Sequence, residues 1–429
     1  MAIVTEAKPT STRLMSIDAL RGFDMFWIIG ADALVSALNR MSQTAPTRFL
    51  ATQLDHVEWQ GFHFYDLIFP LFVFIVGVSL VFSLSKTIAQ VGRPEAVKRV
   101  VRRGILLFLL GIFYYGGFSN TWPGIRLMGV LNRIALAYFF AGLLFCFLKP
   151  RALVAVCVGL LLGYWALMAL VPIRDIQLTP ANIARLAREV GDVQTAAYFE
   201  NSDSPNASTI KGSPAFAGAK RLFYSTTTRV KGKYSKGYNL CDHTDFRYLP
   251  GKKWDVFADP EGLLSTIPAI ATCLLGVFAG LILKSETVSQ ERKVILLVGC
   301  GIVALAAGWL WNIEFPVVKK IWSSSYVLVA GGNSAILLGL FYLIIDVWEK
   351  RWWCQPLVWI GMNSITVYLA KNILGGFSKI AARFIGGDIK AFLDRQLAGS
   401  GDLTIALLGL LLAIWFVQFL YRKKIFLRV

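Results

Sequence analysis

Ionisable side chains inside long apolar stretches are the residues of this sequence best placed to do chemistry. The apolar block that begins near Ile17 holds Asp18, Arg21, Asp24 and Asp32. At about 100° per residue these four lie on one stripe of a helix, which must face protein or water because a charge facing lipid is costly. Arg21 and Asp24 are three residues apart and can neutralise each other. Asp32 lies roughly 16 Å further along the helix with no basic neighbour in its block, so it is the stronger functional candidate.

Histidine is the second residue type with useful chemistry, because a neutral imidazole can remove the proton of an attacking amine near pH 7. The sequence contains three histidines, His56, His63 and His243. His56 and His63 lie just before and at the start of the second apolar block, in which Asp66 follows. A histidine beside a membrane surface is more often a plain interfacial residue, so spacing alone leaves both interpretations open.

Further polar residues lie inside later apolar blocks. They are Asn132 and Arg133 in the fourth block, and Asn363 and Lys371 in the ninth. Each would lack a partner in lipid, so together they indicate a polar central cavity. Hydrogen bonding between helices is the alternative for the amides.

The blocks themselves predict an all-α, polytopic transmembrane helix bundle. Hydrophobic residues make up 56% of the 429, and charged residues only 16%, against roughly 25% in soluble domains. The apolar residues fall in stretches of roughly 20, the length that crosses a bilayer core. We expect about ten spans, near residues 17–38, 62–85, 103–118, 127–148, 152–172, 264–284, 293–312, 326–346, 356–377 and 402–421.

Basic residues set the expected orientation. With the N-terminus inside, Lys and Arg of the inner segments outnumber those of the short outer loops about two to one, which predicts cytoplasmic termini. The chain then divides into residues 1–172 (helices 1–5 with the catalytic loop), 173–263 (a small extracytoplasmic cap) and 264–429 (helices 6–10). The first apolar block is long enough to span and carries internal charges, so no cleaved signal peptide is expected.

Several function classes are disfavoured. The net charge of +18 would suit nucleic acid, but basic loops of a membrane protein account for it, and no nucleic-acid partner is expected. The six cysteines show no metal-like spacing, and no metal site is predicted. The sequence has no phosphate-binding glycine loop, no zinc-protease motif and no nucleophile elbow.

Several motifs carry a family resemblance. The stretch from Ser16 to Gly22 (SIDALRG) resembles the opening signature of the YeiB-like membrane acyltransferase superfamily. The stretch from His56 to Gly77 (HVEWQGFHFYDLIFPLFVFIVG) is similar to the heparan-alpha-glucosaminide N-acetyltransferase family and its bacterial NagX-type relatives. Residues 129–133, 259–266 and 361–365 match further blocks in the same order, whereas the 173–250 segment is unmatched.

The resemblance implies an enzyme that takes acetyl groups from cytoplasmic acetyl-CoA and delivers them to the amine of glucosamine or a related amino sugar on the other side. The family's catalytic histidine falls on His56. A family asparagine falls on Asp32, where a carboxylate could orient His56 as a dyad. A family histidine falls on Lys371, which is counted with Asp66 and Glu261 as substrate-binding.

A mechanism that fits these residues places the phosphates of acetyl-CoA against Arg21 and Arg133, with Asn132 beside them. His56 takes the proton of the attacking amine, and Asn363 stabilises the developing oxyanion. Transfer through an acetyl-His56 intermediate is the open mechanistic alternative.

Two other functions stay open. The polar stripe could line the path of a sugar transporter, although no inverted hydropathy repeat is seen. The chain could instead O-acylate a cell-envelope glycan. We expect a multi-pass protein of the bacterial inner membrane, surrounded by lipid, with a homodimer as an open alternative to a monomer.

Overall fold

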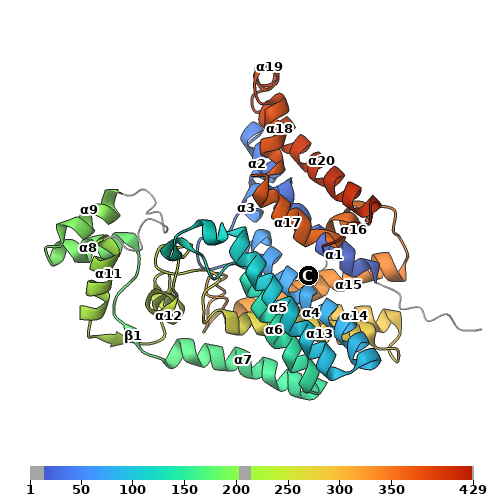
Figure 1. Cartoon of the computed structure of the whole chain (residues 1–429), viewed down its shortest axis with the longest axis horizontal. Coiled ribbons are helices and arrows are strands. Elements are labelled where there is room, and N and C mark those ends of the chain that lie inside the picture. Colours follow the sequence, from blue (N-terminus) through green and yellow to red (C-terminus); the bar gives the residue numbers. More distant parts are fainter. Residues whose placement is uncertain (1–13, 202–213, 428–429) are drawn as a thin grey trace, which may run out of the picture.

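The computed structural model describes residues 14–201 and 214–427, and within these residues the fold is almost wholly helical (Figure 1). Among the described residues, strands occur only as two short antiparallel pairs, in which β1 (Ile173–Arg174) pairs with β2 (Arg229–Val230) and β3 (Tyr234–Ser235) pairs with β4 (Tyr238–Asn239). The predicted all-α class is confirmed. The basic residues near the N-terminus that were counted in predicting the orientation lie outside the described residues.

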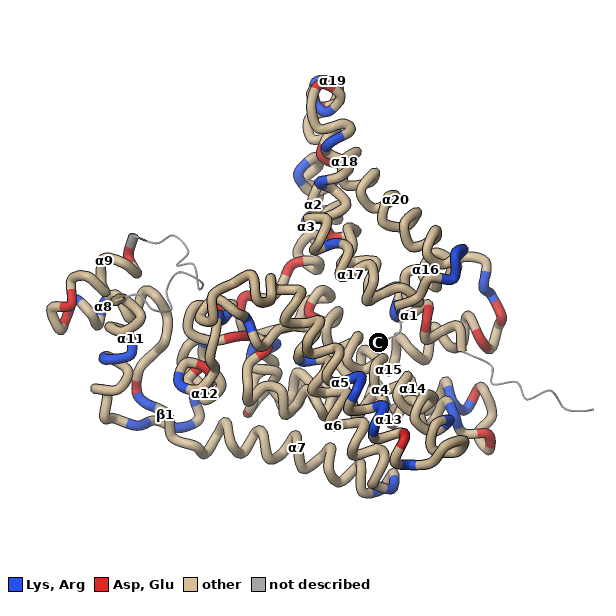
Figure 2. Tube along the Cα trace, in the orientation of Figure 1, with Lys and Arg blue, Asp and Glu red and all other residues tan. Residues whose placement is uncertain are grey.

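Seven of the described helices are long and apolar enough to cross a membrane. Charged residues gather in the loops and at the ends of these helices, as Figure 2 shows. The seven are α4 (Phe64–Val91), α6 (Val130–Phe147), α7 (Pro150–Leu170), α13 (Thr266–Lys284), α14 (Gln290–Trp311), α15 (Ser324–Tyr342, continued by the π turn η4, Leu343–Val347) and α20 (Ser400–Arg422). The prediction of a multi-pass membrane bundle is thereby confirmed.

The other three predicted spans are also helical, but each is interrupted or charged. The first is split into α1 (Met15–Phe26) and α2 (Asp32–Met41) by a π turn, η1 (Trp27–Ala31), in which Gly30 has φ 154°. The third is α5 (Arg93–Tyr114), whose first half carries most of its basic residues. The ninth is broken at Asn363 between α16 (Gln355–Met362) and α17 (Ser364–Ile373).

The remaining short helices lie outside this set. The loop helices are α3 (Ala45–Gln53), η2 (Gly117–Ser119) and η3 (Trp122–Gly124). Helices α18 (Phe377–Ile385) and α19 (Asp388–Gln396) pack on α20 and project from the bundle at the top of Figure 1.

Helices α4 and α13 approach each other very closely in the bundle. A Cβ atom on Gly77 would lie 2.0 Å from the carbonyl oxygen of Cys273, and one on Gly276 would lie 1.9 Å from the carbonyl oxygen of Phe74. The two backbones therefore touch at reciprocal glycines, the arrangement by which small residues let membrane helices approach closely.

The segment between α7 and α13 forms a cap beside one end of the bundle, at the left of Figure 1. Its helices are α8 (Pro180–Glu189), α9 (Val193–Asn201), α11 (Pro214–Ser225) and α12 (Leu240–Tyr248). They enclose a separate hydrophobic core that includes Phe199, Phe216, Phe223 and Phe246. The cap is thus an ordered unit with its own packing.

His243 lies inside this cap core. Its ring packs on Phe223 with the centroids 5.3 Å apart, and Nε2 lies 3.0 Å from the carbonyl oxygen of Ile176, to which it donates. Burial lowers the pKa of His243 to about 4. The imidazole is therefore neutral and structural near neutral pH.

The α4–α13 contact predicts that Gly276→Ala destabilises the protein by about 2 kcal/mol or more, because the added methyl group would overlap a carbonyl oxygen. Thermal unfolding of the detergent-solubilised protein measures this loss. Gly163→Ala in α7 is the matched control, since a Cβ there meets nothing within 4 Å. Equal melting temperatures for the two variants would contradict the packing described.

The burial of His243 predicts a pH-dependent cap. The unfolded chain binds one more proton than the folded chain between about pH 4 and 6.5, so the free energy of unfolding falls as the pH drops through that window. The contribution is of the order of 3 kcal/mol. His243→Gln keeps a donor for Ile176 but cannot titrate, so its stability should fall less from pH 6.5 to 4 than that of the wild type. Parallel pH profiles of the melting temperature would refute this assignment.

Candidate active site

The loops that precede α4, α13 and α15 meet the start of α6 at one end of the bundle. The Tyr326 hydroxyl donates to the carbonyl oxygen of Asp66 at 2.8 Å, which joins the starts of α15 and α4. The amide of Gly61 donates to the carbonyl oxygen of Val317 at 2.9 Å, which joins the two preceding loops. Residues far apart in the sequence therefore share one small region.

A cavity of about 230 Å³ opens at this end and extends between α1, η1, α4, α6 and α17. Its inner walls are apolar, with Met25, Ile28, Phe72, Ile134 and Ile365 among them. Its polar lining residues are His56, Tyr65, Glu261, Lys319, Ser364 and Tyr368. The cavity thus combines a long apolar wall with a polar mouth, as ligand pockets commonly do.

His56 stands at this mouth and is held by Asp66. Its Nδ1 atom lies 2.8 Å from Oδ1 of Asp66, while its side chain remains 50% exposed. Asp66 is buried at the start of α4, and its Oδ2 accepts from the backbone amides of His63 (3.1 Å) and Val57 (3.3 Å). A carboxylate fixed in this way accepts a hydrogen bond from the Nδ1–H group of His56 and leaves Nε2 able to accept a proton.

Lys319, from the loop before α15, completes the cluster. Its ammonium nitrogen lies 3.0 Å from Nδ1 and 3.3 Å from Nε2 of His56, and 3.3 Å from Oδ1 of Asp66. Burial lowers the pKa of Lys319, and the charge of Asp66 opposes that shift. Sequence reasoning counted Lys319 only as a basic loop residue. The available signal was its place just before the eighth span, on the same predicted outer side as His56.

Asp32 does not form the pair with His56 that the resemblance suggested. Its Oδ2 accepts from the hydroxyl of Tyr65 at 3.2 Å, and the Tyr65 ring lies 4.9 Å from the His56 ring. The carboxylate that holds His56 is Asp66, ten residues further along the chain. The physical reason is local, because the loop of His56 folds back onto the first turn of α4, whereas Asp32 reaches that region only through Tyr65.

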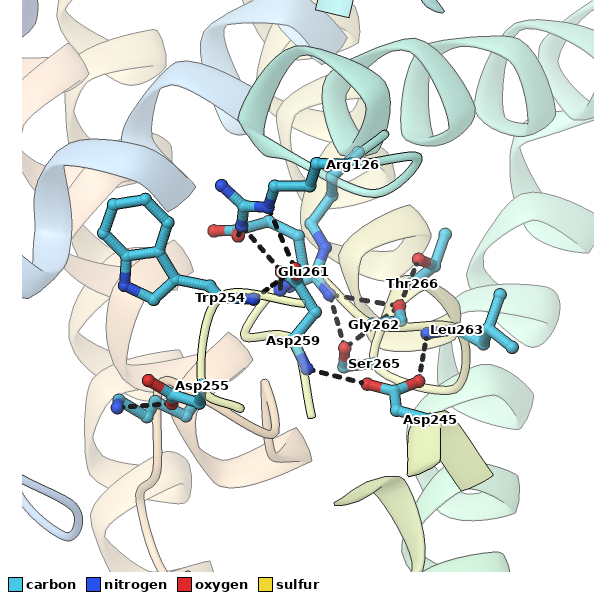
Figure 3. A network of polar contacts seen from close by, with 12 residues as sticks. Arg126, Asp245, Trp254, Asp255, Asp259, Glu261, Gly262, Leu263, Ser265 and Thr266 are labelled. Carbon is cyan, nitrogen blue, oxygen red and sulfur yellow. Dashed lines mark hydrogen bonds and ion pairs between the residues drawn. The ribbon is translucent and has the colours of Figure 1, made fainter. Parts of the chain in front are cut away.

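Glu261 forms part of the cavity wall and is anchored by a buried arginine (Figure 3). Arg126 donates to both oxygens of Asp259, at 2.9 and 2.7 Å, and to Oε2 of Glu261 at 2.6 Å. Its guanidinium also lies 4.4 Å from the Tyr115 ring centre and 5.0 Å from that of Trp254. Burial and the charge of Asp259 raise the pKa of Glu261, and Arg126 opposes this shift. Sequence reasoning missed Arg126 as part of this site.

Arg133 and Asn132 lie on α6 but outside the cavity lining. Arg133 is fully buried, donates to the carbonyl oxygen of Gly262 at 3.3 Å and to the hydroxyl of Ser265, and stacks on Trp322 at 4.8 Å. The Asn132 amide donates to a backbone carbonyl of α5 at 2.8 Å. Both connect structural elements here, and their predicted role toward acetyl-CoA stays a prediction.

Arg21 lies on α1, outside the residues that line the cavity. It is four residues before Met25 and seven before Ile28, so the three share one helix face, with Arg21 a turn further from the mouth. Its guanidinium donates to the hydroxyl of Ser79 in α4 at 2.7 Å. Its predicted contact with acetyl-CoA stays a prediction.

Arg21 and Asp24 do not form the ion pair that their spacing allowed. The carboxylate beside Arg21 is Asp18, at 3.4 Å. Asp24 is fully buried, and neither of its carboxylate oxygens has a hydrogen-bond partner within residues 14–201 and 214–427. The helix turns Asp24 away from Arg21, toward the core.

Asn363 and Lys371 belong to the broken ninth segment. Asn363 sits at the break, with its amide nitrogen 3.2 Å from the carbonyl oxygen of Trp359, and the next residue, Ser364, lines the cavity. The Lys371 ammonium donates to the carbonyl oxygen of Ile28 in the π turn. Lys371 thereby supports the cavity wall at Ile28, and the catalytic and substrate roles of the two residues stay predictions.

His63 has a structural contact, and no metal site emerges from the described part of the chain. The Nδ1 atom of His63 lies 3.1 Å from the carbonyl oxygen of Asp55, at the start of α4. Within the described ranges, no group of three or more His, Cys, Asp or Glu side chains is arranged to hold a metal ion.

The Arg126 cluster predicts a strong stability effect. Arg126→Leu leaves Asp259 and Glu261 buried without a countercharge, which should cost about 3–5 kcal/mol in thermal or denaturant unfolding. Adding Asp259→Asn and Glu261→Gln removes the uncompensated charges and should recover much of the loss. A single variant as stable as the wild type would show that the carboxylates do not depend on Arg126.

Comparison with known proteins supports the expected kinship. Residues 13–188 match the family described as heparan-alpha-glucosaminide N-acetyltransferase, catalytic. The chain is 25% identical over 411 residues to the human heparan-alpha-glucosaminide N-acetyltransferase, covering 87% of this chain and 55% of the relative. It is 27% identical over 344 residues to the mouse protein of that name, covering 75% and 49%. The chain therefore spans about half the length of the curated relatives it matches. The predicted similarity to the heparan-alpha-glucosaminide N-acetyltransferase family is confirmed by these matches.

Proposed function

We propose that this protein transfers an acetyl group from acetyl-CoA to the amine of glucosamine or a related amino sugar, across a membrane. The observation that carries the proposal is the cluster of His56, Asp66 and Lys319 at the polar mouth of an otherwise apolar cavity. The names of the relatives support the reaction class.

His56 acts as the general base in this proposal. Asp66 accepts a hydrogen bond from the Nδ1–H group, so Nε2 can take the proton of the amine as its nitrogen attacks the thioester carbonyl. The carbon–nitrogen bond forms, the carbon–sulfur bond breaks, and the proton passes from Nε2 to the leaving thiolate. The products are the N-acetyl sugar and CoA, and His56 returns to its neutral form.

The cavity offers a route for the acetyl donor. The apolar wall of Met25, Ile28 and Ile134 suits the slender pantetheine arm of acetyl-CoA, and Arg21 continues the same face of α1 beyond it. An arginine there can bind phosphate with two parallel hydrogen bonds. We assign the phosphate contact to Arg21, whose side chain is 19% exposed, in preference to Arg133, which is fully buried.

Lys319 is proposed to stabilise the oxyanion that forms when the carbonyl is attacked. It lines the cavity next to His56, and its side chain is largely buried. Preorganised donors at such a point contribute strongly to transition-state stabilisation. Asn363 is the second proposed donor of a hydrogen bond to the oxyanion. It directly precedes Ser364, which lines the cavity.

The two substrates would reach the site from opposite sides. The mouth at His56 lies at the end of the bundle that carries the cap, and Arg21 lies toward the other end. We place the mouth on the extracytoplasmic side of a bacterial inner membrane, with the amino sugar entering there and acetyl-CoA from the cytoplasm.

The test is release of free CoA from acetyl-CoA by the detergent-purified protein, with and without glucosamine. His56→Ala and Asp66→Asn should lower kcat by roughly 10²–10⁴-fold, the range of a lost general base. Lys319→Met should also lower kcat, with partial recovery in Lys319→Arg. The matched control is His63→Asn, a nearby histidine outside the cavity lining, which should keep wild-type turnover.

Other outcomes point to other functions. CoA release without an acceptor would favour an acetyl-His56 intermediate. A product acetylated on a hydroxyl, with its amine still free, would identify an O-acyltransferase. Sugar flux into liposomes with no consumption of acetyl-CoA would replace the proposal with a transporter.

A further inference from the structure

The proposed reaction leaves one proton without an acceptor. The amine of glucosamine is mostly an ammonium group at neutral pH, because amines with electron-withdrawing neighbours, such as α-amino groups, have a pKa of about 8. An ammonium group must lose one proton before its nitrogen can attack, and a second proton as the amide forms. His56 accepts a single proton and passes it to the leaving thiolate. A second proton acceptor is therefore needed wherever the ammonium form is the substrate.

The surroundings of His56 increase this need. The Lys319 ammonium nitrogen lies 3.0 Å from Nδ1 and 3.3 Å from Nε2 of His56. A second cation at this point would be repelled by Lys319. The acceptor should therefore reach His56 as a neutral amine, after giving its first proton to a different group of the cavity wall.

Glu261 is the group of the cavity wall suited to take that proton. Within the part of the chain that the structure describes, it is the one carboxylic acid among the residues that line the cavity with His56 and Lys319. Its side chain is 12% exposed, and it comes from the loop before α13, a different element from the loop of His56. Asp66, the carboxylate that contacts His56, lies outside this lining. An ammonium group in the cavity therefore meets its carboxylate at Glu261.

Arg126 binds both Asp259 and Glu261 (Figure 3), but the two carboxylates are held unequally. Asp259 accepts from the guanidinium at both oxygens, and also from the backbone amides of Trp254 at 3.0 Å and Glu261 at 3.1 Å. Glu261 is bound by the guanidinium through Oε2 at 2.6 Å. Hydrogen bonds to the ionised form keep a carboxylate ionised. Of the two acids, Glu261 is therefore the one that can take up a proton.

The charges around Glu261 come from several elements, and their balance favours proton uptake. Burial raises the pKa of Glu261 and the charge of Asp259 raises it further, whereas Arg126 and Arg133 oppose the shift. The other titratable groups that interact electrostatically with Glu261 are Lys319, Tyr115, Tyr326 and Tyr368. A carboxyl group whose pKa is raised toward that of an amine can exchange a proton with it at low cost.

We propose that Glu261 accepts the first proton of the acceptor's ammonium group and so delivers a neutral amine to His56. The inference rests on the proposed acetyl transfer and adds the step that precedes attack. An N–H bond of the ammonium group breaks, and its proton passes to the Glu261 carboxylate. The neutral nitrogen then bonds to the acetyl carbon as the carbon–sulfur bond breaks, and the second proton passes through His56 to the thiolate. The proton on Glu261 leaves to water at the mouth, so each transfer releases one proton.

The test compares kcat/KM for glucosamine at pH 7 and pH 9 in the wild type and in Glu261→Gln. Glutamine keeps an oxygen for Arg126 but cannot accept a proton, so the variant can use only the neutral amine. About a tenth of the amine is neutral at pH 7, whereas most of it is neutral at pH 9. The ratio of wild-type to variant kcat/KM should therefore be about ten at pH 7 and close to one at pH 9. Glu58 is an exposed carboxylate outside the cavity lining, and Glu58→Gln is the matched control, with a ratio close to one at both pH values.

Asp259→Asn tests the same step without altering Glu261, and it serves where Glu261→Gln does not fold. It removes the charge that raises the proton affinity of Glu261 and leaves Arg126 to Glu261 alone. Its loss of kcat/KM should therefore also be larger at pH 7 than at pH 9.

The pH dependence separates the possible outcomes. A loss of equal size at both pH values would give Glu261 a structural role and overturn the inference, and so would a variant equal to the wild type at pH 7. Either result in a protein that releases CoA with glucosamine would leave acetyl transfer standing. No glucosamine-dependent release by the folded wild type at either pH would refute acetyl transfer itself, and the inference with it.

Discussion

The buried charge of Arg126 is the constraint on which the site end of the bundle depends. A guanidinium that is 4% exposed is tolerable only with countercharges and hydrogen bonds close by. Asp259 and Glu261 supply them, which fixes the loop between the cap and α13. That loop is tied to the cap as well, because Asp245 accepts from the amides of Asp259 at 3.2 Å and Leu263 at 2.9 Å. One desolvated cation thereby places part of the wall of the cavity at His56.

A second constraint comes from two segments next to the cavity whose backbone is not regularly helical. Such backbone is tolerated within a membrane only where protein or water satisfies its polar groups. The π turn η1 exposes carbonyl groups, and Lys371 donates to one of them at Ile28. The break at Asn363 similarly ends α16 beside Ser364. Irregular segments of this kind occur often at functional sites, and here they allow α1 and α17 to line an open space instead of a packed one.

The sequence predicted the helical blocks and several of the site residues, but not how those residues pair. Apolar length gives the spans, because the bilayer imposes it. His56 and Asp66 are ten residues apart, but the family resemblance favours Asp32 as the partner of His56. A position in a family motif says nothing about how a loop folds back on a helix. Lys319 contacts His56 across a separation of 263 residues, which no local pattern encodes. Arg21 and Asp18 pair as i, i+3 neighbours, and periodicity allowed the competing choice of Asp24 equally well.

The charges of the cluster bear on why these three residues occur together. With His56 neutral, Asp66 and Lys319 balance, and the group carries no net charge at the edge of an apolar cavity. When His56 takes the proton of an amine, the group becomes positive at the same moment as the attacked carbonyl oxygen becomes negative. These opposite charges attract, so the transition state is stabilised more than the resting state. An Asp66–His56 pair without Lys319 would begin with a negative charge and reach neutrality, so no net positive charge would face the oxyanion. The lysine therefore changes the cluster from a base alone into a base matched to the charge of the reaction it is proposed to catalyse.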